Sequence, residues 1–205
     1  MRKQISAIER LKELPPVFRG ADLTIRFQWD SKTASQYLYL WKRRNLVQGL
    51  GGHSDVFANL LIAQYPDWEK ALLMAMPSAV VIGVEVLRRV GWTTQIPDRP
   101  NVAVTAKHPV FKTNVYNIEA RDLVWFAKVA PGIRRDGDVA IVLPTLAPAW
   151  ALADMLKREG WGTCGLWPDD LDLEVSASDE ADWRAASVAF GMPETRLIDQ
   201  AALSR

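Results

Sequence analysis

The sequence predicts an α+β protein with two parts, and three observations lead to this prediction. Residues 1–60 hold short helical stretches followed by two strand-like runs around a glycine-rich tip. The remainder alternates apolar strand-like runs with longer helical patterns, as mixed α/β domains do. The change of character near residue 64 has no glycine–serine linker. We therefore expect an N-terminal winged helix-turn-helix over residues 1–63 and a mixed α/β C-terminal domain over residues 64–205.

The N-terminal part is predicted to hold three helices, over residues 4–14, 21–27 and 31–44. Pro15 and Pro16 end the first helix, because proline lacks the amide hydrogen that a helix needs. Trp29 and Asp30 form a tight turn before Ser31. We expect Ser31 to cap the third helix and Asp30 to add negative charge at its positive end. Two helices joined by a tight turn are the helix-turn-helix layout.

A glycine-rich hairpin is predicted directly after the third helix. Asn45 suits the left-handed position that ends a helix. Residues 46–50 and 56–60 favour strands around a tip at residues 51–55, and glycines allow such a tip to approach a DNA backbone closely. The alternative of a phosphate-binding glycine loop fits neither of its sequence templates. We expect residues 47–60 to form the wing.

The third helix has two unlike faces on a helical wheel. Its apolar face can pack into a core and holds Ala34, Tyr37, Leu38 and Trp41. Its opposite face is polar and holds Lys32, Ser35, Gln36, Tyr39 and Arg43. An amide suits paired contacts to adenine, and cations suit guanine or phosphate. This pattern predicts a recognition helix, the alternative being an ordinary solvated helix face.

The residues expected to contact DNA come from this helix and the wing tip: Ser31, Lys32, Thr33, Ser35, Gln36, Tyr39, Lys42, Arg43, Arg44 and His53. Lys42 and Arg44 lie at the flanks of the wheel, where phosphate contact is expected. His53 has an equal alternative as a solvated loop histidine. Two such helices in a homodimer would lie about 34 Å apart and would bind an inverted repeat.

The charge distribution agrees with a polyanionic partner. The formal net charge is +1. Basic residues outnumber acidic ones over residues 1–53, and acidic residues outnumber basic ones from residue 169 onward. A basic first quarter is typical of proteins that bind nucleic acid, and the alternative is two solvated faces that differ in charge.

The helices and strands of the C-terminal part are predicted from longer runs of apolar residues. Helices are expected over residues 67–76, 79–90 and 147–158, with further helices from residue 180 and after Pro193. The segment 80–84 has an alternative as a strand, because it is rich in β-branched residues. Strands are expected over residues 92–97, 102–106, 110–118 and 139–143, and residues 171–175 alternate between apolar and acidic side chains as a strand can. Residues 121–129 are not assigned.

Composition and motifs argue against several kinds of structural, metal-binding and catalytic site. One cysteine, Cys164, excludes an internal disulfide and fits a reducing cytoplasm. We expect no membrane helix, no signal peptide and no cofactor. His53, His108 and Cys164 lie too far apart in sequence to suggest a zinc site, and no nucleophile–base arrangement is evident.

An acidic cluster is the one feature that suggests metal-dependent enzymatic activity. It consists of Asp169, Asp170, Asp172 and Glu174, whose carboxylates are ligands that hard metal ions prefer. The favoured alternative is a solvated acidic edge. We therefore expect no metal site and no catalytic residue.

Several motifs resemble those of a known family. They are residues 76–82 (MPSAVVI), residues 87–95 (LRRVGWTTQ), Leu152-Ala153-Asp154 and residues 167–171 (WPDDL). With the preceding winged helix, they resemble the AbiEi family, the antitoxins and transcriptional regulators of type IV toxin–antitoxin, or abortive infection, systems. The similarity covers about residues 18–174. Its motifs are structural and include no catalytic residue.

The resemblance implies a function that composition alone does not suggest. It implies a winged helix that binds double-stranded operator DNA and represses its own operon, and a C-terminal domain with antitoxin activity. The partner would be a nucleotidyltransferase-like toxin, neutralised without need of a stable complex. The sequence has no Gly-Ser pair followed by Asp-x-Asp, which is the signature of a nucleotidyltransferase, so we expect the regulator and not the toxin. A winged helix that binds a protein instead of DNA stays an alternative.

Overall fold

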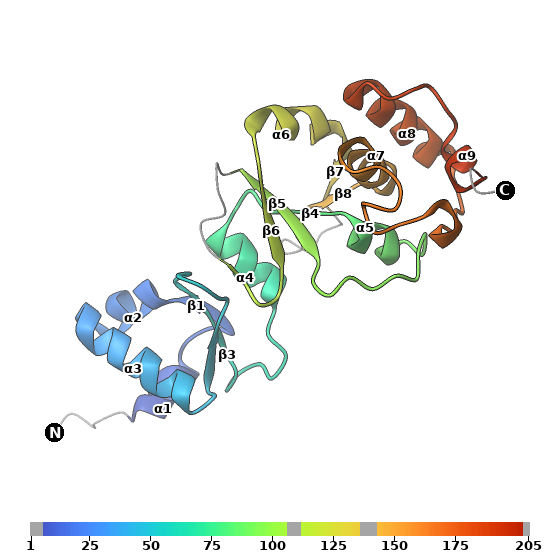
Figure 1. The fold of residues 1–205 in the computed structure, drawn as a ribbon. Helices are drawn as coiled ribbons and strands as arrows, with labels where there is room; N and C mark the ends of the chain where they lie inside the picture. The colour runs from blue at the N-terminus through green and yellow to red at the C-terminus, as the bar shows by residue number, and fades with distance from the viewer. Residues whose placement is uncertain (1–5, 106–111, 136–142, 203–205) are drawn as a thin grey trace. The chain divides into compact units, whose positions relative to one another are not determined.

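The computed structural model describes residues 6–105, 112–135 and 143–202. Its contacts divide the chain into two compact units, Met1–Pro77 with Phe111–Val115, and Ser78–Val110 with Tyr116–Arg205. Each unit combines helices with one sheet, so the chain is a mixed α/β protein, as expected for the α+β class (Figure 1). The first unit continues past residue 64 because helix α4 (Trp68–Ala75) packs on its sheet.

Unit 1 contains three further helices and three short strands. The helices are α1 (Ala7–Lys12), α2 (Gly20–Phe27) and α3 (Ser31–Arg43). The strands are β1 (Val17–Arg19), β2 (Val47–Gly49) and β3 (Val56–Asn59). They form an antiparallel sheet in the order β1-β3-β2. The expected helices and hairpin are present, and β1 is an addition that the sequence did not predict.

The start of α3 differs from the prediction by one residue. Asp30, not Ser31, is the N-cap, because its carboxylate accepts the amide hydrogen of Thr33 at 2.7 Å. At the other end, Asn45 has the expected left-handed conformation, with φ 54°. Gln28, which ends α2, is also left-handed, with φ 56°. This residue produces the sharp change of direction between α2 and α3.

The core of unit 1 joins the helices to the sheet. Its fully buried members include Leu11, Phe18, Leu23 and Trp41. Buried Asn59 fastens the N-terminal segment, since its side-chain amide donates to the carbonyl of Leu11 at 2.8 Å. A buried polar group needs such partners, and here they connect β3 to α1.

Unit 2 is built on a five-stranded mixed sheet in the order β6-β5-β4-β8-β7. Its strands are β4 (Val80–Ile82), β5 (Asn101–Thr105), β6 (Asn117–Arg121), β7 (Ile133–Arg134) and β8 (Thr145–Leu146). Its helices are α5 (Val84–Arg89), α6 (Leu123–Val129), α7 (Pro148–Arg158), α8 (Ala177–Phe190) and α9 (Leu197–Ala202), with 3-10 turns η1 (Ala130–Gly132) and η2 (Pro168–Asp170). Buried α7 packs against α5 and α8.

Several predictions for this unit need correction. The helix expected over residues 79–90 is a strand followed by a short helix, so the strand alternative is right for its first part. Residues 92–97 form no strand, and β6 starts only at Asn117. Residues 171–175 alternate in burial but join no sheet. The strand expected over residues 139–143 lies outside the described residues except for Leu143.

No helix in the described ranges is long and apolar enough to cross a membrane.

Candidate nucleic-acid interface

The polar face of α3 lies open to solvent. All the residues of α3 and its C-cap that were expected to contact DNA are exposed except Thr33, which is half-buried. On the opposite face, Ala34 and Trp41 are buried, and Tyr37 and Leu38 are half-buried. The two faces therefore separate as the helical wheel predicts, and Gln36 and Arg43 are accessible from outside the unit.

Acidic side chains are absent from this part of the chain. The sequence has no Asp or Glu from Ser31 to Ser54, a stretch that spans α3, β2 and the hairpin tip. The acidic residues on either side of this stretch, Asp30 and Asp55, both accept hydrogen bonds within the unit. Asp30 caps α3, and hydrogen bonds from Thr33 hold the pKa of its carboxyl below the ordinary value. Asp55 binds the start of α2.

Asp55 connects the hairpin to α2 through two hydrogen bonds. Its carbonyl accepts the amide hydrogen of Gly20 at 2.9 Å, and its carboxylate accepts that of Ala21 at 3.3 Å. The Asp55 carboxylate lies directly against Gly20, so a Cβ added at this position would force that side chain to move. These contacts fix the hairpin relative to the helix that precedes α3.

Lys42 is exposed and also contacts an aromatic ring of the hairpin, while its phosphate contact stays a prediction. Its ammonium nitrogen is 4.6 Å from the centroid of the Phe57 ring in β3, within the range of a cation–π interaction. Phe57 packs in turn on Phe18, with ring centroids 5.7 Å apart. Lys42 therefore joins the C-terminal end of α3 to the hairpin.

The other cationic side chains of α3 and its C-cap make fewer contacts with the rest of the unit. The guanidinium of Arg43 lies 5.8 Å from the ring centroid of Tyr39, one turn earlier on the exposed face. The side chains of Lys32 and Arg44 have no hydrogen bond or ion pair among the described residues. His53 is exposed at the hairpin tip, as expected.

An aromatic cluster that sequence reasoning missed holds the turn before α3. Trp29 stacks on Tyr37 with ring centroids 4.3 Å apart, and its ring also lies near Phe27 and Trp41. The guanidinium of Arg10, on α1, lies 5.1 Å from the Trp29 ring. The aromatic residues were visible in the sequence, but no local pattern pairs Arg10 with them. This cluster fixes the orientation of α3 in the unit.

The acidic segment 169–174 is partly explained by local structure. The carboxylate of Asp170 accepts the amide hydrogen of Trp167 at 2.7 Å, which stabilises η2. Asp169, Asp172 and Glu174 are exposed. Over the three described ranges, no group of three histidine, cysteine or acidic side chains is arranged to hold a metal ion.

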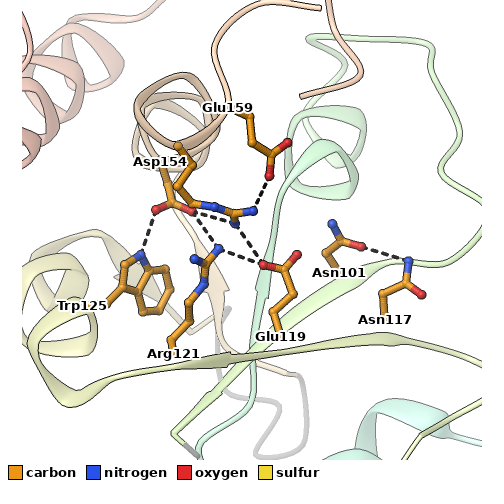
Figure 2. Close-up of polar contacts among 8 residues, drawn as sticks. Asn101, Asn117, Glu119, Arg121, Trp125, Asp154 and Glu159 are labelled. Carbon is orange, nitrogen blue, oxygen red and sulfur yellow. Dashed lines mark hydrogen bonds and ion pairs between the residues drawn. The ribbon is translucent and has the colours of Figure 1, made fainter. Parts of the chain in front are cut away.

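A second charged cluster lies in unit 2, between β6 and α7 (Figure 2). Arg121 and Arg158 both donate to the Glu119 carboxylate, at 2.8 and 2.9 Å. The carboxylate of Asp154 accepts the indole hydrogen of Trp125 at 2.8 Å, but the two guanidinium groups are farther away, at 3.5 and 3.8 Å. Glu119 thus takes the closer contacts with the cations.

Burial dominates the electrostatics of this second cluster. It raises the pKa of Asp154 to about 6, although the hydrogen bond from Trp125 acts in the opposite direction. Burial also raises the pKa of Glu119. Together with Glu159, the cluster holds more carboxylates than guanidinium groups, which favours retention of a proton.

Comparisons with known proteins establish a fold but no family. No family model and no curated protein matches the sequence. The chain is similar in structure to the RV2827C protein from Mycobacterium tuberculosis, whose crystal structure is known, with a TM-score of 0.52 and 16% sequence identity. The match covers 95% of this chain and 75% of that one. At this level of identity, the likeness shows a shared fold alone.

Proposed function

We propose that unit 1 contains a winged helix-turn-helix that binds double-stranded DNA, with α3 as the recognition helix and the β2–β3 hairpin as the wing. The observation that carries this proposal is the accessible face of α3, which presents Gln36 and Arg43 within an acid-free stretch of chain. Such a face attracts phosphates and offers the amide and guanidinium groups that bind base edges.

The surrounding contacts support the same proposal. A recognition helix must be held rigidly against its neighbours, because base contacts depend on position. The aromatic cluster around Trp29 and the link between Lys42 and Phe57 provide such support. Asp55 ties the hairpin to α2. These contacts do not cover the polar face of α3, which stays exposed to solvent.

We further propose that the protein is a transcriptional autorepressor and antitoxin of a type IV toxin–antitoxin system. This part rests on the resemblance to the AbiEi family, with a nucleotidyltransferase-like toxin as the functional partner. A homodimer with two α3 helices about 34 Å apart would bind inverted repeats upstream of the operon. Unit 2 would then carry the antitoxin activity.

The test combines gel shifts with a reporter of repression. The full chain should retard a duplex from its own upstream region and repress a promoter placed there, and Gln36→Ala and Arg43→Glu should weaken both effects. Arg184→Glu is the matched control, because Arg184 is an exposed helical arginine of unit 2. Equal binding by Arg43→Glu and wild type would overturn the proposal. Growth after co-expression with the neighbouring gene tests the antitoxin part.

One observation favours a second candidate, a winged helix that binds a protein. Apolar side chains are exposed on α2 and α3, with Ile25 at 76%, Tyr39 at 60% and Leu40 at 44%. Exposed apolar residues of this kind occur in protein interfaces. Co-purification of a tight protein complex, with no DNA affinity at low salt, would favour this candidate over the first.

A further inference from the structure

A segment from far along the chain belongs to unit 1. Residues Phe111–Val115, between β5 and β6 in sequence, group with Met1–Pro77 by their contacts. Of these, residues 112–115 are described, and the backbone of residues 112–114 lies against Gly51 at the tip of the β2–β3 hairpin. A Cβ added to Gly51 would be 2.6 Å from the carbonyl oxygen of Lys112 and 2.9 Å from the Cα of Thr113. The two backbones are therefore in direct contact.

Gly51 is suited to this contact in two ways. Its φ is 135°, a conformation that other residues rarely adopt. Its missing side chain leaves the space that the 112–114 backbone fills. Close approach of one backbone to another is a recognised use of glycine in strands and turns. The position of the segment is thus specified by the hairpin.

The segment is anchored at its centre and exposed on both sides. Thr113 is buried, with 4% of its surface exposed, while Lys112 and Asn114 are exposed. This alternation directs Thr113 toward the unit and leaves the lysine in solvent. The side chain of Lys112 has no ion pair or hydrogen bond among the described residues.

The hairpin itself lacks the cation that a wing needs. From Val47 to Asn59 the sequence has no lysine or arginine, and its one histidine is His53. A wing that approaches phosphates gains affinity from cations, since phosphate neutralisation supplies much of DNA affinity. Around the segment, no acidic residue occurs between Asp98 and Glu119. Lys112 therefore adds a positive charge beside a hairpin whose own residues include no lysine or arginine.

We propose that residues 112–114 form part of the DNA-binding surface, with Lys112 as a phosphate contact beside the hairpin tip. This inference rests on the proposed function of unit 1 and extends its DNA-binding surface beyond residues 31–60. Asn114, exposed on the other side of Thr113, carries an amide that suits a phosphate or a sugar oxygen.

The experiment measures the affinity of the full chain for its upstream duplex at several salt concentrations. Each phosphate contact contributes about 0.9 to the slope of log affinity against log salt concentration. Lys112→Ala should therefore weaken binding and lower this slope by about one, and Lys112→Arg should restore both. Lys157→Ala is the control, because Lys157 is an exposed lysine of unit 2. Thermal melting should show that each variant is folded.

The outcomes separate this inference from the proposed function. If Lys112→Ala binds as wild type does at every salt concentration, while Lys32→Ala loses affinity, the inference is overturned and the DNA-binding proposal stands. If the wild-type chain shows no salt-dependent binding to any duplex, the proposed function fails and the inference fails with it. A slope lowered equally by Lys157→Ala would also overturn the inference, since the effect would then follow net charge and not position.

Discussion

The ammonium group of Lys42 lies 4.6 Å from the centroid of the Phe57 ring, so a cation at the end of α3 is attached to the hairpin. An added Cβ at Gly49 would lie 3.6 Å from the same ammonium nitrogen, which shows that the side chain runs across β2 as well. The contact joins the two elements of the proposed interface. It distinguishes Lys42 from Arg43, whose guanidinium lies near a ring of the same helix, Tyr39.

We expect Lys42→Met to loosen the hairpin without removal of a phosphate contact. Methionine keeps much of the apolar stem, and the lost cation–π interaction should lower the free energy of unfolding by about 0.5–1 kcal/mol. DNA affinity should fall, whereas the slope of log affinity against log salt should stay near that of wild type. Arg44→Ala is the comparison, and it should lower that slope by about one. An equal drop in slope for Lys42→Met would mean that Lys42 contacts a phosphate.

Gly20→Ala should destabilise unit 1 through Asp55. The new methyl group would collide with an Asp55 carboxylate oxygen, so this exposed side chain would have to turn away and lose its hydrogen bond from Ala21, at a cost of about 0.5–1.5 kcal/mol. Asp55→Ala removes the obstacle along with one hydrogen bond, so the double variant Gly20→Ala/Asp55→Ala should be more stable than the sum of the two single effects. Chemical denaturation of all four proteins measures this coupling. Strictly additive effects would show that the two residues do not interact as described.

Asp154 should make the stability of unit 2 depend on pH. Its pKa is raised in the folded state from 3.8 to about 6, so the folded protein holds this proton more tightly than the unfolded chain does. The stabilisation is complete below pH 3.8 and is lost as the pH rises through about 6. Each tenfold difference in proton affinity corresponds to about 1.4 kcal/mol. Relative to Asp154→Asn, the wild type should therefore lose stability between pH 4 and pH 7.

The variant Trp125→Phe provides an independent check on the same cluster. In the wild type, the indole N–H of Trp125 stabilises the charged form of Asp154. Loss of this hydrogen bond should raise the pKa of Asp154 further and move the pH dependence of stability to higher pH. The measurement is the free energy of unfolding by urea across pH 4–8. A constant difference between wild type and Asp154→Asn over this range would contradict the assignment.

Local patterns predicted the helices of unit 1 well. Apolar residues at helical spacing identify α3, and the glycines at residues 51 and 52 identify the hairpin, because both signals lie within a few residues. The sequence does not decide which residue caps α3, because Asp30 and Ser31 are adjacent and both residue types favour the N-cap position. The short strand β1 was missed, since Val17 and Phe18 show no alternation and depend on pairing with β3.

Contacts between residues that are distant in sequence could not be predicted. Alternation over residues 171–175 suggested a strand, but a strand also needs a neighbour, and the amide hydrogen of Asp172 bonds only to the isolated carbonyl of Trp92. Gly51 and Lys112 lie far apart in sequence, as do Arg121 and Asp154. No periodic pattern encodes such pairs, because they follow from how the elements pack.

The most direct test of the central claim is the affinity of the full chain for its upstream duplex, measured by fluorescence anisotropy with wild type, Gln36→Ala, Arg43→Glu and Arg184→Glu. We predict tight binding that weakens steeply with salt, a loss of discrimination against an unrelated duplex for Gln36→Ala, and a large loss of affinity for Arg43→Glu. Arg184→Glu should bind as wild type does. Equal affinities for all four proteins, or no binding at low salt, would contradict the account.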